Sequence, residues 1–294
     1  MKPIETVAVV GGGPAGIACA IWLKRLGMLP KIFERHHLGG QLHDITLSLQ
    51  DVPGFYGANV SVLLADLVQQ LHQMGIDVYE GHDVVAFDEA EKLLTCADGA
   101  TYYAQAVVYA PGLRTRDLKV PGAQWVTSLS TSALLAQPLA GEVLIVGGGD
   151  RAFEAALRLS EAGKSVRLIH RRDHFRARPD FQQRVRALGI PVHVNTTVEA
   201  ITPTQGGVEV VLKGPRTTKR VKVAVVMVRI GMEPDIQPGL CSSVLSDVVP
   251  LWPSSRLRVI GDAVTPVPFR SIVTAFASGM VAAKEIVMNP PWRS

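Results

Sequence analysis

The stretch TVAVVGGGPAGIACAIWLKRLGMLPKIFER, residues 6–35, has a second copy in EVLIVGGGDRAFEAALRLSEAGKSVRLIHR, residues 142–171. The two stretches align without a gap, at an offset of 136 residues from Thr6 to Glu142. Each copy has a short apolar run, a glycine-rich turn, a stretch with apolar residues at i, i+3 and i+4, and a second apolar run. This pattern is typical of a strand–helix–strand unit. Its repetition predicts two parallel-sheet domains in one chain.

The turn between strand and helix reads G-x-G-x-x-G in the first copy and G-x-G-x-x-A in the second. In this motif the first glycine allows a tight turn, the second lets the backbone approach a pyrophosphate, and the third position allows close packing of helix on strand. Because each turn follows an apolar strand and opens a helix, we expect two dinucleotide sites rather than two ordinary loops. The candidate residues are Gly11, Gly13, Pro14, Ala15 and Gly16 in the first copy, and Gly147, Gly149, Asp150 and Ala152 in the second.

The end of the second strand differs between the copies, and the difference predicts which dinucleotide each one binds. Glu34 ends the first copy, and a carboxylate there can accept hydrogen bonds from both ribose hydroxyls of an adenosine. The equivalent residue in the second copy is His170, followed by Arg171 and Arg172, with Arg176 close behind. Guanidinium groups bind a 2′-phosphate, which a carboxylate would repel. The second copy is therefore predicted to bind NADP; the alternative is a solvated basic edge.

The composition excludes several classes of protein. Of the 294 residues 47% are hydrophobic and 19% are charged, as in a well-packed globular protein, and no apolar run approaches the roughly 20 residues that span a membrane. The sequence enters its first strand without a secretory leader, so we expect a cytoplasmic protein with no membrane partner. Residues 164–186 carry eight Lys and Arg against two Asp, but no aromatic platform or helix-turn-helix pattern accompanies them. A nucleic-acid partner is therefore not expected.

Cysteine usage argues against a metal site or a disulfide framework. The three cysteines, Cys19, Cys96 and Cys241, are far apart and form no C-x-x-C or mixed His/Cys metal pattern. We expect each of them to be an isolated structural thiol. No metal site is predicted.

The order of predicted elements indicates a discontinuous first domain. A final strand ends at Gly261-Asp262, and a helix is predicted from about Ser271 to Val287. The predicted fold class is α/β, with two Rossmann-like three-layer dinucleotide-binding domains and the NADP domain inserted in the FAD domain. The predicted bounds are 1–115 and 246–294 for the FAD domain and 116–245 for the NADP domain.

Over essentially its whole length the chain resembles the thioredoxin-reductase-like flavoproteins. The resemblance is carried, in family order, by the motifs GGGPAG, LGGQL (38–42), DVPGF (51–55), GGGDRA, HRRDHFRA, RIGMEPD and IGDA. It implies FAD in the first unit, NADPH in the second and a homodimer. It also implies that the helix from Ser271 points its N-terminus at the flavin, where the helix dipole stabilises negative charge. The resemblance assigns Glu34 to the adenosine ribose, Gln41 to the isoalloxazine, Val84 to the adenine and Asp262 to the ribityl or pyrophosphate portion, and adds Gly40, Asp51, Gly112 and Gly261 as cofactor-binding residues.

One motif of the dithiol enzymes in this family is missing. Thioredoxin reductases of this type carry a C-x-x-C shortly before the first strand of the NADP domain. The equivalent stretch here is STSA, Ser130 to Ala133. A hydroxyl cannot take part in thiol–disulfide exchange. Thioredoxin reduction is therefore disfavoured, and DVPGF and HRRDHFRA are more similar to the ferredoxin (or flavodoxin)–NADP reductases of thioredoxin-reductase type.

If both cofactors bind, hydride passes between them and no catalytic side chain is expected. Asp51 is the one titratable group of interest, because a buried carboxylate near the flavin would have a raised pKa and would disfavour the anionic reduced ring. The alternative is a loop carboxylate that caps the VPGF turn. Trp292 is a candidate aromatic cover for the flavin, the alternative being a frayed tail.

Three functions remain open from the sequence. The first is an NADPH-dependent FAD reductase that passes electrons to ferredoxin or flavodoxin. The second is an NAD(P)H-dependent reductase of a small molecule or of oxygen. The third is a cofactor-binding protein without turnover, in which the lost dithiol marks a lost activity.

Overall fold

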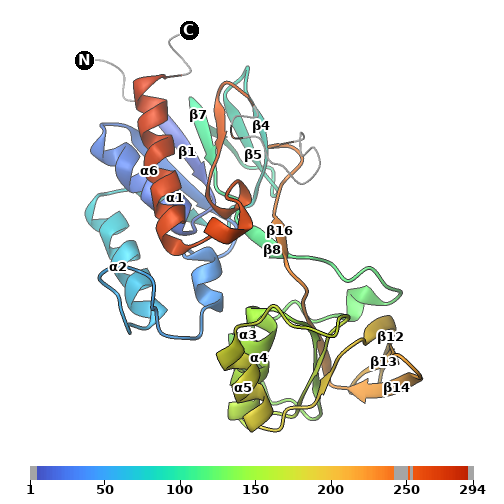
Figure 1. The fold of residues 1–294 in the computed structure, drawn as a ribbon. Coiled ribbons are helices and arrows are strands. Elements are labelled where there is room, and N and C mark those ends of the chain that lie inside the picture. Colours follow the sequence, from blue (N-terminus) through green and yellow to red (C-terminus); the bar gives the residue numbers. More distant parts are fainter. Residues whose placement is uncertain (1–4, 242–250, 252–253, 291–294) are drawn as a thin grey trace. The chain divides into compact units, whose positions relative to one another are not determined.

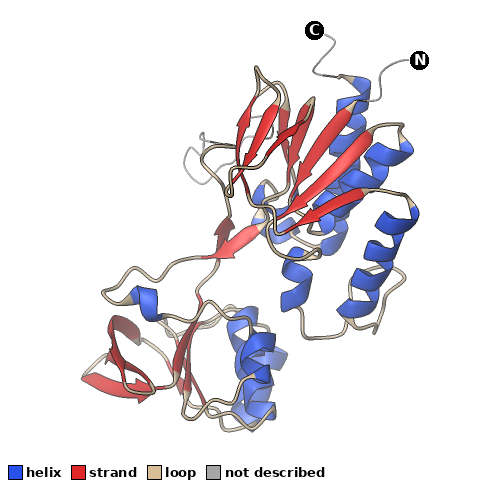
Figure 2. Cartoon of the chain, turned by 180° about the vertical axis from the view of Figure 1, so that it is seen from behind, coloured by secondary structure: helices blue, strands red, loops and turns tan. Residues whose placement is uncertain are grey.

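The computed structural model describes residues 5–241, 251 and 254–290. The chain divides into two compact units (Figure 1), which we call unit 1 (Met1–Arg114 with Glu233–Ser294) and unit 2 (Thr115–Met232). Unit 2 is thus inserted between the two segments of unit 1. In each unit, helices cover one face of a parallel sheet and a small antiparallel sheet covers the other (Figure 2). The predicted α/β class with two three-layer units is confirmed.

Unit 1 is built on a five-stranded parallel sheet. In spatial order its strands are β17 (Leu257–Val259), β7 (Ala106–Tyr109), β1 (Thr6–Val10), β2 (Leu29–Glu34) and β3 (Asp77–Glu80). The covering elements are the helices α1 (Pro14–Arg25), α2 (Val60–Gln73) and α6 (Ile272–Met288) and the antiparallel strands β4 (Val84–Asp88), β5 (Leu93–Cys96) and β6 (Thr101–Tyr103). Val7 and Val9 of β1 pack on the helical side, whereas Ala8 and Val10 pack on the opposite side. The central strand is apolar throughout because both of its faces are buried.

Unit 2 repeats this plan on a smaller scale. Its parallel strands, in spatial order, are β11 (Val192–His193), β10 (Val166–Ile169), β9 (Val143–Gly147) and β15 (Val225–Arg229). The covering elements are the helices α3 (Thr131–Ala136), α4 (Asp150–Glu161) and α5 (Pro179–Ala187) and the antiparallel strands β12 (Thr197–Thr204), β13 (Gly207–Lys213) and β14 (Thr218–Val223). Leu144 and Val146 of β9 share an apolar core with Val208 and Val210 of β13. The antiparallel sheet therefore packs face to face on the parallel one.

The remaining elements are short. They are the strands β8 (Leu113–Thr115) and β16 (Met232–Pro234), which pair with each other, and the 3-10 turns η1 (Gly40–Asp44), η2 (Ala123–Trp125), η3 (Gly261–Ala263) and η4 (Val267–Phe269). In the described part of the chain, none of the helices has the length and apolar character needed to cross a membrane.

The two divisions between the units lie at β8 and β16. The first follows Arg114, one residue from the expected boundary at 115/116. The second precedes Glu233, because the segment that follows it is tied to unit 1: the amide of Gln237 donates to the hydroxyl of Tyr109 at 2.8 Å. The expected boundary at 245/246 lies outside the described residues.

Candidate cofactor-binding sites

The three glycines of the G-x-G-x-x-G pattern in the first turn have three different environments. Gly11 has a φ of +106°, and a Cβ there would overlap the carbonyl oxygen of Ala110. A Cβ at Gly16 would overlap the carbonyl oxygen of Gly11. At Gly13, by contrast, nothing lies within 4 Å of an added Cβ. Two glycines thus allow close packing, and the third leaves open space at the N-terminus of α1, where backbone N–H groups can bind a phosphate.

Glu34 is held rigidly at the end of β2. The residue is only 8% exposed. The amide of Gly12 donates to Oε2 at 2.7 Å, and the amide of His36 donates to Oε1 at 2.9 Å. Each carboxylate oxygen can accept a second hydrogen bond. The carboxylate is therefore positioned to bind a pair of hydroxyls.

Two further turns converge on the first one. The amide of Gly39 donates to the carbonyl of Gly12 at 2.8 Å, and an added Cβ at Gly40 would lie 3.3 Å from the Cα of Gly13. Gln41 Nε2 donates to the carbonyl of Leu113 at 3.4 Å, next to Gly112. The tertiary structure thus brings Gly40, Gln41 and Gly112 to the same edge of the sheet as the glycine-rich turn.

Asp262 adds an unpaired acceptor at this edge. Among the described residues its Oδ1 is buried and has no hydrogen-bond partner. Burial raises the pKa of the Asp262 carboxyl, and Arg270 partly opposes that rise. An added Cβ on the preceding Gly261 would lie 3.0 Å from the Cβ of Ala15, in the first turn of α1. The buried, unpaired oxygen and the open space at Gly13 fit a polar ligand such as a dinucleotide.

Helix α6 is fixed at both its start and its middle. Ser271 caps the helix by accepting from the amide of Thr274 at 3.1 Å, and the hydroxyl of Thr274 accepts from the amide of Ser271. Further along, a Cβ at Gly279 would overlap the carbonyl oxygen of Ala15. Figure 1 shows α6 alongside α1 in unit 1. This close packing explains why the helix carries a glycine in its interior.

Asp51 is exposed in the loop before α2. Its part in tuning a flavin stays a prediction. Val84 is buried in the core beside Leu94 and Cys96, and its contact with adenine stays a prediction. Trp292 lies outside the described residues.

The turn of unit 2 repeats the geometry of the first. A Cβ at Gly147 would overlap the carbonyl oxygen of Arg229 and would lie 2.9 Å from the Cβ of Ala152. At Gly149 nothing lies within 4 Å of an added Cβ. As in unit 1, the open position stands at the N-terminus of a helix, here α4. The second turn therefore also has room for a phosphate.

The position equivalent to Glu34 is filled differently in unit 2. The ring of His170 lies against Gly148, so closely that an added Cβ would overlap it, and its other neighbour is the ring of Phe175, 5.4 Å away between centroids. Burial lowers the pKa of His170, and the charges of Arg172 and Arg171 lower it further. His170 thus packs as a half-buried ring. In unit 2 no carboxylate occupies the equivalent position.

The arginines after His170 lie on a loop tied to the turn. The amide of Arg176 donates to the carbonyl of Gly148 at 2.8 Å, and the amide of Arg178 donates to Asp150 Oδ1 at 2.7 Å. Asp150 thus holds this loop, and its expected contact with the cofactor stays a prediction. The side chains of Arg171, Arg172 and Arg176 are exposed, and no ion pair within the described residues uses them. Three guanidinium groups are therefore available beside the open turn.

The stretch Ser130 to Ala133 forms the start of helix α3. Ser130 is the N-cap of α3, and its Oγ accepts from the amide of Ala133 at 3.0 Å. The three cysteines are all buried in unit 1. Burial raises the pKa of the Cys19 and Cys96 thiols. No group of three metal-ligating side chains occurs in the described part of the chain.

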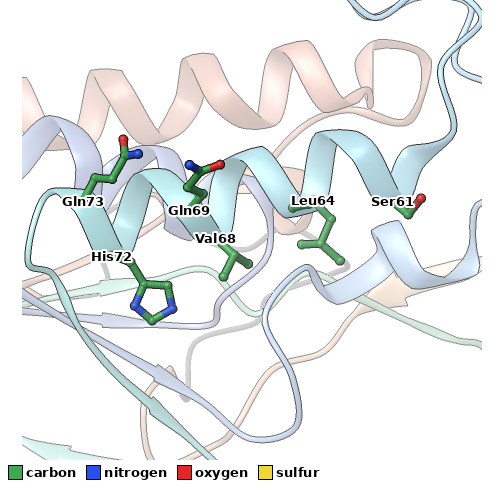
Figure 3. Close-up of a pocket in the computed structure, with 7 residues that line it drawn as sticks. Ser61, Leu64, Val68, Gln69, His72 and Gln73 are labelled. Carbon is green, nitrogen blue, oxygen red and sulfur yellow. The ribbon is translucent and has the colours of Figure 1, made fainter.

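A shallow pocket of about 690 Å³ lies elsewhere, along the outer face of α2 (Figure 3). Its lining residues are Ser61, Leu64, Ala65, Val68, Gln69, His72 and Gln73. None of the predicted cofactor residues lines it. This pocket is therefore not one of the candidate cofactor-binding sites, which lie at the two glycine-rich turns.

Several contributing residues were not predicted from the sequence. Gly12 and Gly148, the variable second residues of the two turns, contact Glu34 and His170. Ser278 of α6 accepts from the amide of Gly261 at 3.1 Å, and Arg178 pairs with Asp150. The matching positions of Gly12 and Gly148 in the repeat were an available signal, whereas the other two contacts have no counterpart in the repeat.

The fold and these turns define a protein with two dinucleotide-binding domains of the Rossmann type. The sequence pattern of the pyridine nucleotide-disulphide oxidoreductase family matches residues 5–243, and the chain belongs to that family. The predicted family resemblance is thereby confirmed. Thioredoxin reductases of this family use FAD and NADPH, in agreement with the predicted cofactors.

Three known proteins illustrate the similarity. The chain is 32% identical over 305 aligned positions to the bifunctional thioredoxin reductase/thioredoxin of Mycobacterium leprae, covering 96% of this chain and 65% of that protein. It is 29% identical to a ferredoxin–NADP reductase of Ignicoccus hospitalis, covering 67% of each. The crystal structure of Lactococcus lactis thioredoxin reductase (FR conformation) matches with a TM-score of 0.81 and 25% identity, covering 96% of this chain and 97% of that one. The chain thus spans just under two thirds of the M. leprae protein.

Proposed function

We propose that this chain is an NADPH-dependent FAD oxidoreductase that works without a redox-active dithiol and passes electrons to a small carrier protein of the ferredoxin or flavodoxin type. The family supports the oxidoreductase class and the two cofactors. The relatives include both thioredoxin reductases and a ferredoxin–NADP reductase, so the choice between acceptors rests on this chain's own residues.

The role of Ser130 is the observation that favours ferredoxin or flavodoxin over thioredoxin as the electron acceptor. Where a dithiol would stand, Ser130 caps helix α3 and Ala133 donates the capped amide. Neither residue can exchange with a disulfide. The cysteines of the chain are buried and lie in unit 1, so they cannot replace a vicinal pair in unit 2.

In this proposal unit 1 holds FAD. The open turn at Gly13 binds the pyrophosphate through backbone N–H groups, and Glu34 accepts from the adenosine ribose. Gln41 and Gly112 lie at the isoalloxazine end. The buried Oδ1 of Asp262, otherwise without a partner among the described residues, accepts from a ribityl hydroxyl.

Unit 2 holds NADPH in the same proposal. Gly149 leaves room for the pyrophosphate at the start of α4. Arg171, Arg172 and Arg176 bind the 2′-phosphate by charge-assisted hydrogen bonds. NADH lacks that phosphate, so these residues select NADPH.

When bound, FAD supplies the redox chemistry by accepting a hydride equivalent from NADPH and releasing electrons to an acceptor. The chain's own residues bind the two nucleotides, orient them and exclude competing acceptors. A homodimer and a cytoplasmic location belong to the same proposal. Light scattering on a size-exclusion column tests the dimer, with a mass of twice 31.6 kDa as the expected result.

The decisive experiment is an anaerobic titration of the purified holoprotein with NADPH and, separately, with NADH, following the visible flavin band. Bleaching at much lower concentrations of NADPH than of NADH supports the hydride path and the arginine site. A flavin that dithionite reduces but neither nucleotide bleaches would refute the proposed activity. Adding ferredoxin to an NADPH–cytochrome c assay then tests the carrier: no stimulation would favour a small-molecule or oxygen reductase.

A further inference from the structure

The two units carry opposite net charges. Unit 2 contains 18 Lys and Arg against 9 Asp and Glu, a formal charge of +9. Unit 1 contains 12 Lys and Arg against 17 Asp and Glu, a formal charge of −5. The modest total of +4 conceals this asymmetry. An acidic protein that approaches the chain is attracted by unit 2 and repelled by unit 1.

Within unit 2, one hairpin concentrates positive charge. The hairpin of β13 and β14, residues 207–223, carries five exposed cationic side chains and a single carboxylate. The carboxylate is Glu209, which pairs with Arg220 at 2.9 Å. The cationic residues, which we call the basic hairpin cluster, are Lys213, Arg216, Lys219, Arg220 and Lys222.

The strand register places most of this cluster on the outer face of the sheet. Leu212 is buried against the parallel sheet, so the next residue, Lys213, points the other way. Arg220 is opposite Val211 and Lys222 is opposite Glu209, on the same outer face as Lys213. Figure 1 shows β12–β14 on the side of unit 2 away from helices α3–α5. The outer face is therefore open to a partner.

The cluster is separate from the residues proposed for NADPH. Those residues, Arg171 to Arg176, follow strand β10 of the parallel sheet, whereas the cluster lies in the antiparallel sheet. Edge strands such as β14 commonly carry charged side chains that prevent association with other strands. That role accounts for the cations on β14 but not for Lys213 on β13 or Arg216 in the turn.

We propose that the basic hairpin cluster is a docking site for an acidic protein, which, given the proposed function, is the small redox carrier. A carrier with a surface of Asp and Glu side chains complements the cluster in sign. Exposed charges of this kind accelerate encounter and orient the partner, and their effect falls with ionic strength.

The test measures binding of a purified acidic [2Fe–2S] ferredoxin, and separately of a flavodoxin, to the holoprotein by isothermal titration calorimetry. The test variant is Lys213→Glu/Arg216→Glu/Lys222→Glu. The matched control is Arg25→Glu/Lys119→Glu/Lys284→Glu, which reverses three exposed cations elsewhere and gives the same net charge. Melting temperature and flavin spectrum establish that all three proteins are folded.

At low ionic strength we expect the hairpin variant to bind about 10–100-fold more weakly than wild type, and the control to stay within about threefold. Most of the difference in affinity between wild type and the hairpin variant should disappear when the ionic strength is raised to about 0.15 M and beyond. Equal weakening in both variants, or no binding of either carrier to wild type, would overturn the proposal. So would hairpin-dependent binding of transfer RNA or anionic vesicles in place of the carriers.

The same proteins separate this inference from the proposed function. Neither the anaerobic bleaching of the flavin by NADPH nor, in a separate assay, the turnover of NADPH with ferricyanide as an artificial acceptor requires the cluster. Both should be equal in wild type and both variants. If NADPH does not bleach the flavin of the wild-type protein, the proposed reductase activity is refuted. The measured binding of the carrier protein to the hairpin then still stands. Normal bleaching with unchanged carrier binding in the hairpin variant would refute only the docking site.

Discussion

At the scale of single residues, two equivalent positions distinguish the two nucleotide sites. Glu34 is a carboxylate held by two backbone amides. His170 instead packs its ring on Gly148, and the adjacent Arg171 and Arg172 leave their guanidinium groups exposed. In the proposed function, this local exchange of charge gives the same turn motif two different nucleotide preferences.

Replacing both guanidinium groups should remove the preference for NADPH. Each charge-assisted hydrogen bond contributes about 1.5–3 kcal/mol. Because the side chains of Arg171 and Arg172 are exposed, we expect contributions near the lower limit of this range. We expect Arg171→Ala/Arg172→Ala to raise the KM for NADPH by about 10–100-fold and to leave the KM for NADH unchanged. Steady-state kinetics with ferricyanide measures both. Arg186→Ala, on the exposed side of α5, is the control; an equal loss for both nucleotides would contradict the assignment.

The buried carboxyl of Asp262 predicts a pH-dependent stability of the FAD-free protein. Burial raises its folded-state pKa above the usual value of 3.8. This group therefore contributes stability at low pH, and the contribution is lost as the pH rises through the folded-state pKa. Asp262→Asn should remove that loss, so the melting temperature of the FAD-free variant should rise relative to that of wild type as the pH increases above the usual carboxyl pKa of 3.8.

The same substitution should weaken FAD binding, because the amide offers a poorer acceptor than a carboxylate. Retained flavin per chain after gel filtration is the measurement. Asp77→Asn, at an exposed position of β3, is the control for both experiments. A flavin content equal to wild type would remove Asp262 from the proposed site.

At the scale of secondary-structure elements, the N-termini of helices position the residues of the candidate cofactor sites. The open turns at Gly13 and Gly149 lie at the starts of α1 and α4, and Ser271 caps α6. Ser130 caps helix α3 in the same way, and in the proposed function it has no chemical role. Its role can therefore be separated from activity.

Ser130→Ala should cost about 0.5–2 kcal/mol of stability, as expected for the loss of a helix cap. It should not change the rate of NADPH-dependent ferricyanide reduction. Urea unfolding followed by circular dichroism measures the first quantity, and flavin turnover measures the second. A large loss of turnover in a folded Ser130→Ala protein would show that the residue has a chemical role.

The contact between α1 and α6 is the second testable feature at this scale. A side chain at Gly279 would overlap the carbonyl of Ala15, next to the FAD turn. We expect Gly279→Leu to destabilise the protein by about 1–3 kcal/mol through overpacking and to lower its flavin content. Ala277→Leu, at an exposed position of the same helix, should do neither. Thermal melting and the flavin-to-protein absorbance ratio distinguish the two variants.

At the scale of the whole molecule, the insertion of unit 2 gives each nucleotide its own folding unit. Oxidised NADP should therefore protect unit 2 alone. At a concentration of about 100 times its Kd, a ligand adds about 2.7 kcal/mol of stability. We expect the slowest backbone amides of β9 and β10 to exchange up to about 100-fold more slowly, with β1 and β2 unaffected. Hydrogen exchange measured by mass spectrometry tests this; equal protection of both sheets would contradict two separate sites.

The segment from Glu233 onward, which returns to unit 1, shows a limit of prediction from the sequence. Asp235 pairs with Arg35, its carbonyl accepts from the hydroxyl of Tyr109, and its amide donates to Gly112. These contacts assign residues from Glu233 onward to unit 1. They join positions more than 100 residues apart, and nothing in the local pattern around Asp235 marks them. The expected return at 246 was placed from the order of predicted strands and helices, which carries no information on such contacts.

The sequence by itself determined the two strand–turn–helix units, their glycine-rich turns, the contrast between Glu34 and His170, and the absence of a vicinal dithiol. These features are local: strand and helix periodicity and the backbone freedom of glycine act within about 30 residues. Only the tertiary structure decided that Asp262 is buried with an unpaired oxygen, that Asp51 is exposed, and that the turns at Gly40 and Gly112 meet the turn at Gly13. Burial depends on how distant segments pack, and local sequence does not specify that packing.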